Sequence, residues 1–193
     1  MTSILDQDFF DAFDTLTLAQ KLLGKELIHE SPKGITSGII VETEAYLYND
    51  KACHSFGGKT PRNSPMFGPP GTAYVYQIYG IHHCFNIVSS NYGIGEAVLI
   101  RALEQVLGIE LTQSRRQKVK LKDLCSGPGK LVQAMDILKN QNGNKLTSPP
   151  LYLKEGIEVG AIIETTRIGI GEGKDEHLPY RFYIKDNKFI SKP

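Results

Sequence analysis

Glu42 and Glu44 belong to the string Val41-Glu-Thr-Glu-Ala-Tyr46, which leads into a long segment rich in glycine, proline and asparagine. A carboxylate on a strand that enters an irregular loop is well placed to act as a general base. Strand alternation puts both glutamates on one face and their neighbours on the other. Taken alone, these six residues favour a plainer interpretation, an exposed strand edge with two solvated acids.

The next group of polar residues lies in positions 52–63, where His54 is followed by the cations Lys59 and Arg62 and by the pair Gly57-Gly58. Backbone amides and cations of this kind are groups that contact nucleic-acid phosphates. A solvated loop with ordinary surface charge explains this segment equally well.

Three tyrosines, Tyr74, Tyr76 and Tyr79, stand close together in a strand-like segment. Tyrosine rings offer flat surfaces on which bases stack, worth roughly 1–3 kcal/mol per base in single-strand binders. For a lone aromatic strand, filling a hydrophobic core is the plainer interpretation.

His82, His83 and Cys84 raise the question of a metal site. Adjacent strand residues point to opposite faces, so the two histidines cannot readily share one ion. The cysteines Cys53, Cys84 and Cys125 are far apart, and their odd number argues against a disulfide framework. We therefore expect neither a metal nor a cofactor.

The densest basic run spans residues 115–122 and holds five cations in eight residues. Such runs are most often solvated faces. The nearby string Ser126-Gly-Pro-Gly-Lys130 superficially suggests a phosphate loop, but it lacks the spacing of a nucleoside triphosphate site.

These groups must be positioned by a chain of 193 residues with 40% hydrophobic and 22% charged residues, which fits one domain, residues 1–193. The net charge of +1 means that any basic surface must be local. No secretory signal starts the chain, and no apolar run approaches the roughly 20 residues of a membrane span. A cytoplasmic protein without a membrane partner is expected.

Periodicity and turn residues predict an α+β fold, a mostly antiparallel curved β-sheet with flanking helices. Helices are predicted over 11–23, 103–114 and 130–138, and long loops over 47–71 and 140–150. Strands are predicted over 35–46, 73–79, 82–89, 97–102, 152–153, 162–166 and 180–184.

Together, these segments resemble the alkyladenine (3-methyladenine) DNA glycosylase family, from about Leu16 to the end of the chain. The similarity lies in many ordered blocks. They are Val41–Tyr46, His54-Ser55, Gly57-Gly58, Thr60–Asn63, Met66-Phe67, Pro70–Thr72, Tyr74–Tyr76, Ile78–Gly80, Cys84 with Asn86, Arg101–Glu104, Leu124–Pro128, Lys130-Leu131, Arg167–Gly169 and Arg181–Tyr183.

The resemblance implies base excision repair without strand cleavage and without a cofactor. Glu44 would activate a water that attacks the deoxyribose C1′, and Arg101 would help to hold that water and a nearby phosphate. A carboxylate also stabilises the oxocarbenium-like sugar that forms as the bond to the base breaks. Alkylated or deaminated purines in duplex DNA are the implied substrates.

The same resemblance implies that the damaged base is flipped out of the duplex. It would lie between Tyr46 on one side and His54 and Tyr76 on the other. Tyr79 would fill the gap left in the duplex, and Asn86 would exclude normal guanine. The segment Tyr79-Gly-Ile-His82 departs from the family's pattern around the wedge tyrosine.

The expected partner is double-stranded DNA that contains a damaged purine, bound by a monomer. A catalytically silent damage-binding protein and a single-strand module built on Tyr74, Tyr76 and Tyr79 are the two alternatives. The residues expected to contact DNA, besides Tyr79, are Lys59, Arg62, Arg115, Arg116, Lys118, Ser126 and Lys130.

Overall fold

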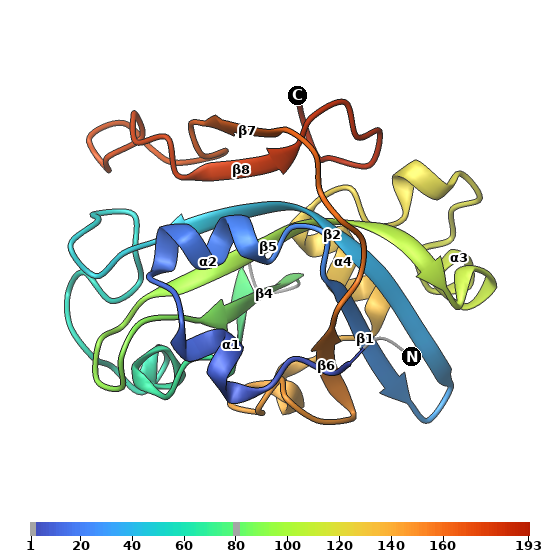
Figure 1. Ribbon diagram of the computed structural model, residues 1–193, viewed down its shortest axis with the longest axis horizontal. Helices are drawn as coiled ribbons and strands as arrows, with labels where there is room; N and C mark the ends of the chain where they lie inside the picture. The colour runs from blue at the N-terminus through green and yellow to red at the C-terminus, as the bar shows by residue number, and fades with distance from the viewer. Residues whose placement is uncertain (1–2, 79–81) are drawn as a thin grey trace.

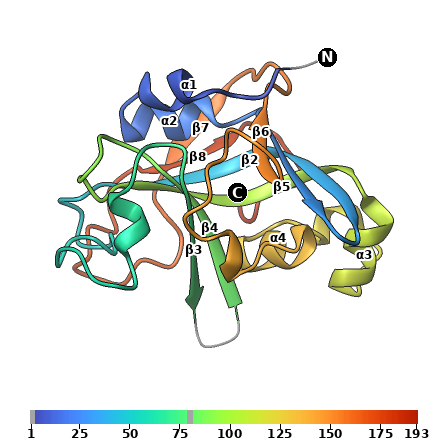
Figure 2. The same ribbon diagram turned by 90° about the horizontal axis from the view of Figure 1, so that it is seen from below.

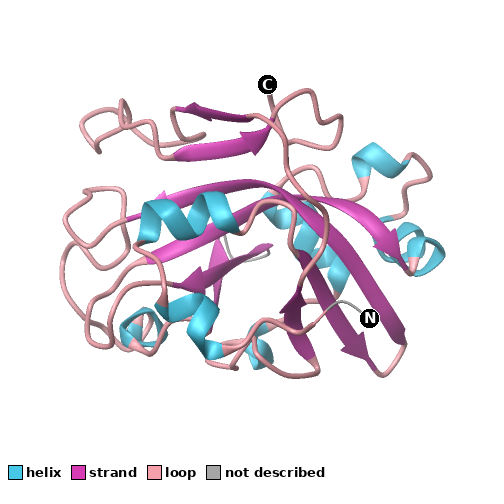
Figure 3. Ribbon diagram, in the orientation of Figure 1, coloured by secondary structure: helices cyan, strands magenta, loops and turns pink. Residues whose placement is uncertain are grey.

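A computed structural model describes residues 3–78 and 82–193 of the chain. It has an α+β fold in which short helices flank one curled antiparallel sheet (Figures 1 and 3). The helices are α1 (Gln7–Asp11), α2 (Thr15–Lys21), α3 (Ile109–Arg116) and α4 (Pro128–Met135), with 3-10 turns η1 (Ser64–Phe67), η2 (Leu121–Asp123) and η3 (Lys139–Gln141). The strands are β1 (Glu26–Ser31), β2 (Gly34–Tyr46), β3 (Ala73–Ile78), β4 (His82–Val88), β5 (Ala97–Leu107), β6 (Leu151–Lys154), β7 (Ile162–Thr165) and β8 (Arg181–Ile184). The predicted fold class is confirmed.

The sheet is organised around β2, a strand of 13 residues. Its strand order is β3-β4-β5-β2-β1-β6, and β8 pairs with β2 beyond the end of β1 while β7 pairs with β8. The pairing of β2 with β5 contains register shifts next to Gly38 and on both sides of Glu42. Such bulges bend a strand, which accounts for the curl of β2 visible in Figure 1.

The N-terminal segment forms two short helices where the sequence predicted one helix over 11–23. Asp6 accepts a hydrogen bond from the amide of Phe9 at 3.0 Å, and Asp14 accepts one from the amide of Thr17 at 2.8 Å. Each aspartate therefore caps a separate helix, because its side chain satisfies an amide that the first turn leaves unpaired. The helices bury Phe10 and Leu18 in the main core.

The prediction of a helix over 103–114 is wrong in its first half. β5 continues to Leu107, opposite Ser37 of β2, and α3 starts only at Ile109. The spacing of apolar residues in 103–107 suits a helix, but pairing with β2 overrides this local preference. Gly108 separates the two elements with φ +73, and a Cβ there would lie 2.4 Å from the carbonyl oxygen of Ile35.

The segment 140–150 was predicted as an exposed loop, which is wrong for two of its residues. Gln141 and Leu146 are buried, and Leu146 belongs to the main core. The segment is held on the fold because Thr72 pairs with Lys145 in an isolated β-bridge.

Strands β3 and β4 extend away from the side of the molecule that carries α1 and α2 (Figure 2). Helices α3 and α4 lie on the same side as this pair of strands (Figure 2). Over the described ranges, no helix combines the length and apolar character that crossing a membrane requires.

Candidate active site

A cavity of about 330 Å³ lies where β2, β3, β4 and β5 meet the start of α4 and the segment before β8. Its wall is aromatic and polar in part and aliphatic elsewhere. The lining residues are Tyr46, Ala52, His54, Met66, Tyr74, Tyr76, Ile78, Cys84, Asn86, Ala97, Leu99, Arg101, Pro128, Ile168, Gly169 and Ile170. Its size falls in the range of pockets that hold a small ligand.

Glu44 lies directly behind this wall and has no exposed surface. One carboxylate oxygen accepts hydrogen bonds from the Tyr46 hydroxyl at 2.8 Å and from Arg101 Nη1 at 3.1 Å. The other accepts the amide of Ile168 at 2.7 Å. All three donors line the cavity. The interpretation of Glu42 and Glu44 as solvated acids on an exposed edge is wrong, because β2 is paired on both sides and neither glutamate is exposed.

Arg101 connects the two glutamates. Its Nε lies 3.3 Å from Glu42 Oε1, while its Nη1 contacts Glu44. Glu42 also pairs with Arg181 Nη1 at 2.9 Å and accepts the backbone amide of Ser191 at 2.6 Å. Buried charges persist only when they are paired and hydrogen-bonded, and this network provides both.

The aromatic residues predicted to hold a base lie together in the cavity wall. The rings of His54 and Tyr76 meet edge to face at a centroid distance of 4.4 Å. Tyr74 is 1% exposed and belongs to the core cluster that forms this part of the cavity wall. Its hydroxyl shares a 3.0 Å hydrogen bond with His54 Nδ1. Partial burial, and then the nearby Arg62 cation, lower the pKa of His54, which favours a neutral imidazole.

Tyr46 forms another part of the wall, and its hydroxyl is a fixed donor. Burial, and then the charge of Glu44, raise the pKa of Tyr46 well above its usual value. The hydroxyl therefore stays protonated and keeps donating to Glu44. The guanidinium of Arg167 lies over the Tyr46 ring, 4.7 Å from its centroid.

Asn86 occupies a buried position on β4 and lines the cavity. Its side-chain nitrogen donates to the carbonyl of Tyr74 on the neighbouring strand at 3.1 Å. Because the amide nitrogen is fixed in this way, the orientation of the side chain is fixed too.

The predicted DNA contacts fall into two groups. Lys59, Arg62, Lys118 and Lys130 are exposed. Arg62 lies over the ring of Tyr76 at 5.8 Å, so one cation borders the cavity. Tyr79 lies outside the described residues.

Arg115 and Arg116, in contrast, are used inside the protein. Arg115 donates to the carbonyl of Ala134 at 2.9 Å, and Arg116 donates to the carbonyl of Leu124 at 3.2 Å. These bonds connect α3 with α4 and the segment before it. Ser126 accepts a hydrogen bond from Lys130 at 3.3 Å.

Sequence reasoning missed the buried residues that support Tyr46 and Glu42. Arg167 forms a two-point ion pair with Asp50, and both side chains have no exposed surface. Arg181 and Ser191 enclose Glu42. The strings that begin at Arg167 and Arg181 were visible in the sequence, but their partners are more than 100 positions away and could not be read from it.

Among the described residues, no group of three or more histidine, cysteine, aspartate or glutamate side chains is arranged to hold a metal ion. Cys53, Cys84 and Cys125 are free and buried.

Comparison with known proteins places this chain in a family. The family model of methylpurine-DNA glycosylase matches residues 8–188. A protein of Francisella tularensis subsp. tularensis named "Putative 3-methyladenine DNA glycosylase" is 52% identical over 92% of this chain and 94% of its own length. Proteins with the same name from Carboxydothermus hydrogenoformans and Methanoculleus marisnigri are 50% and 47% identical, covering 98% and 93% of this chain and 99% and 94% of their own lengths. The chain belongs to the methylpurine-DNA glycosylase family and is an enzyme of that class.

Proposed function

We propose that this protein is a DNA-3-methyladenine glycosylase that flips a damaged purine out of duplex DNA and hydrolyses its N-glycosidic bond. The observation that carries the proposal is the fully buried Glu44, whose three hydrogen-bond donors all line one cavity. Family membership supports the same activity.

In this mechanism Glu44 takes a proton from a water that attacks C1′ of the deoxyribose. A carboxylate has about four acceptor positions, and three are filled by Tyr46, Arg101 and the amide of Ile168. One position is therefore left for a water. As the bond to the base breaks, the sugar gains positive charge, which the anion of Glu44 stabilises. With no lysine nucleophile in the scheme, the strand stays intact.

The flipped base would lie between Tyr46 and the pair formed by His54 and Tyr76. The three residues line the same cavity, which supports this placement. An alkylated purine is cationic and electron-poor, so it gains most from contacts with aromatic faces. A neutral lesion such as hypoxanthine needs protonation before it leaves. Tyr79 would plug the duplex and Asn86 would reject guanine, roles that rest on the family resemblance.

Lys59, Arg62, Lys118 and Lys130 are the proposed phosphate contacts, because they are exposed. Arg115 and Arg116 have partners within the protein, so they support the α3–α4 region and contact DNA only in addition. We further propose that residues 1–193 act as one catalytic domain, as a monomer and in the cytoplasm. Residues that line the cavity come from positions 46 to 170, which supports one catalytic unit.

The direct test is release of free base from duplexes that carry 3-methyladenine, 7-methylguanine, hypoxanthine or ethenoadenine, with an undamaged duplex as control. We expect release of at least one alkylated base and an intact strand until alkali is added. A protein that binds lesions but releases no base would instead be a silent damage-binding protein. Equal binding to single strands without lesion preference would favour a single-strand module.

A further inference from the structure

The ion pair of Asp50 and Arg167 lies against the aromatic wall of the cavity. Arg167 Nη2 donates to Asp50 Oδ1 at 3.0 Å, and Nη1 donates to Oδ2. Neither side chain has exposed surface. Arg167 also donates to the carbonyls of Ala45 and Asp175, at 3.1 and 3.2 Å. The guanidinium is therefore fixed in place.

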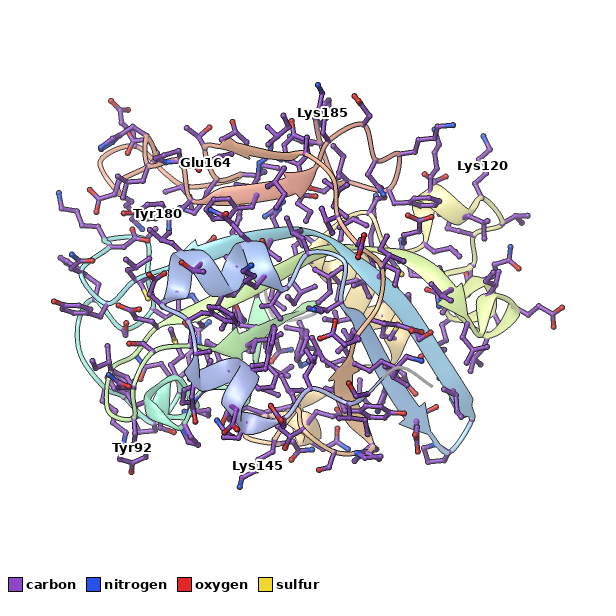
Figure 4. The ribbon with its side chains drawn as sticks, viewed as in Figure 1. Tyr92, Lys120, Lys145, Glu164, Tyr180 and Lys185 are labelled. Atoms are coloured by element: carbon purple, nitrogen blue, oxygen red, sulfur yellow. The ribbon has the colours of Figure 1, made fainter. Side chains whose placement is uncertain are left out.

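The fixed guanidinium lies over two aromatic rings, 4.7 Å from the centroid of Tyr46 and 5.5 Å from that of Tyr180 (Tyr180 is labelled in Figure 4). Tyr46 lines the cavity, whereas Arg167 does not. The guanidinium therefore lies on the side of the Tyr46 ring that faces away from the cavity.

A cation in this position influences a base bound in the cavity in two opposite ways. It holds the Tyr46 ring in place as a surface for the base. It also draws electron density from that ring and repels a positively charged base on the ring's other side. A full charge about 10 Å away changes the binding of another charge by roughly tenfold at an effective dielectric constant of about 20. An unpaired Arg167 would therefore work against a cationic alkylated purine.

We propose that Asp50 is a specificity-determining residue, which neutralises Arg167 so that Tyr46 remains a favourable surface for cationic purines. Arg167 is the positioning residue of the pair, and Asp50 sets the charge behind the ring. This inference rests on the proposed function, since it needs the flipped base to lie against Tyr46.

The test compares binding of two duplexes, one with cationic 7-methylguanine and one with neutral hypoxanthine. The full chain carries Glu44→Gln throughout, so that binding is measured without excision. The quantity of interest is the ratio of the two affinities, each taken relative to an undamaged duplex, at neutral pH, where carboxylates are ionised. Thermal unfolding verifies that each variant is folded.

Asp50→Asn leaves the arginine charge uncompensated, and we expect the preference for 7-methylguanine to fall roughly tenfold. Arg167→Gln leaves the carboxylate uncompensated and should raise that preference. Arg167→Lys keeps the charge, and the double variant Asp50→Asn with Arg167→Gln removes both charges, so both should stay close to the parent ratio. A purely structural role would weaken both duplexes equally and leave every ratio unchanged.

Breaking a buried ion pair is strongly destabilising. If Asp50→Asn does not fold, the test rests on the other two variants. The preference for 7-methylguanine should rise in Arg167→Gln and return to the parent value in the double variant. The inference is overturned if the preference for 7-methylguanine shifts in the same direction in both single variants, or if it shifts in neither. Excision of 7-methylguanine by the unmodified chain, which keeps Glu44, is measured in parallel. Its absence would contradict the proposed function, whereas normal excision with unmoved ratios would contradict this inference alone.

Discussion

Glu42 and Glu44 are two residues apart on β2, equally buried, and connected by one arginine, yet their surroundings differ. Glu44 is held by Tyr46, Arg101 and the amide of Ile168, which all line the cavity. Glu42 shares Arg101 with Glu44, but its other partners, Arg181 and Ser191, do not line the cavity.

The difference lies in where the donors to each carboxylate come from. Glu42 has four donors, three on one oxygen and one on the other, and they come from two arginines and Ser191. Glu44 has three donors, all of them from residues that line the cavity, and keeps one acceptor position. Two acids that look equivalent in the sequence are thus a structural anion and a candidate base.

The largest effect is expected from removing the connection between the two acids. Arg101→Met leaves Glu44 without its cation and Glu42 with only one arginine. Removing one partner of a buried ion pair costs about 3–5 kcal/mol of unfolding free energy. Denaturant unfolding measures this cost, and a loss below about 1 kcal/mol would show that the network contributes little to folding.

A smaller effect, on excision, is expected from Tyr46, whose hydroxyl contacts Glu44 and not Glu42. Tyr46→Phe keeps the aromatic wall but removes a hydrogen bond to a charged group, and such bonds contribute about 1.5–3 kcal/mol. Single-turnover excision should fall at least tenfold while lesion binding is retained. Tyr76→Phe is the matched control, since its hydroxyl interacts with Cys84 and not with Glu44. Equal losses in both variants would argue against a specific role for the Tyr46 hydroxyl.

Asn86 should affect selectivity more than rate. Replacing it by alanine removes the polar group proposed to reject guanine, and discrimination built on such a clash is lost with it. Release of guanine from undamaged DNA should rise several-fold relative to the parent, with lesion excision largely retained. Unchanged guanine release together with normal lesion excision would contradict the filter role.

The smallest effect is expected for the surface cations, where exposed residues should affect DNA binding and residues with partners inside the protein should affect stability. Lys120 projects away from the body of the molecule at the α3–α4 side (Figure 4), and Lys118 is exposed beside it. If Lys118 contacts a phosphate, Lys118→Gln should flatten the log–log salt dependence of binding by about 0.9. Arg115→Gln should instead lower stability, because Arg115 binds the carbonyl of Ala134. An unchanged slope for Lys118→Gln would make this run a solvated surface.

Local patterns were enough to predict much of the sheet. The strand over 35–46 matches β2 closely, and the aromatic segment forms β3, because alternation and β-branched residues act locally. Leu103–Leu107 could not be assigned correctly, since its apolar spacing suits a helix and only the pairing with β2 makes it a strand.

For the site, the residues could be located from motifs, but their environments could not. Alternation put Glu42 and Glu44 on one face, yet their burial depends on β8 and on Ser191, which follow more than 130 residues later. The partnership of Asp50 with Arg167 has the same origin. Long-range ion pairs of this kind leave no periodic signal in one sequence.

The most direct test of the central claim compares Glu44→Gln with Glu42→Gln in single-turnover excision from a duplex carrying an alkylated purine, with lesion binding measured in parallel. Glu44→Gln should bind nearly as well as the parent and lose at least about 100-fold in excision, because glutamine cannot take a proton from water. Glu42→Gln should lose stability but, where folded, keep much more activity. An essential Glu42 and a dispensable Glu44 would contradict the account and, with it, the roles given to Tyr46 and His54.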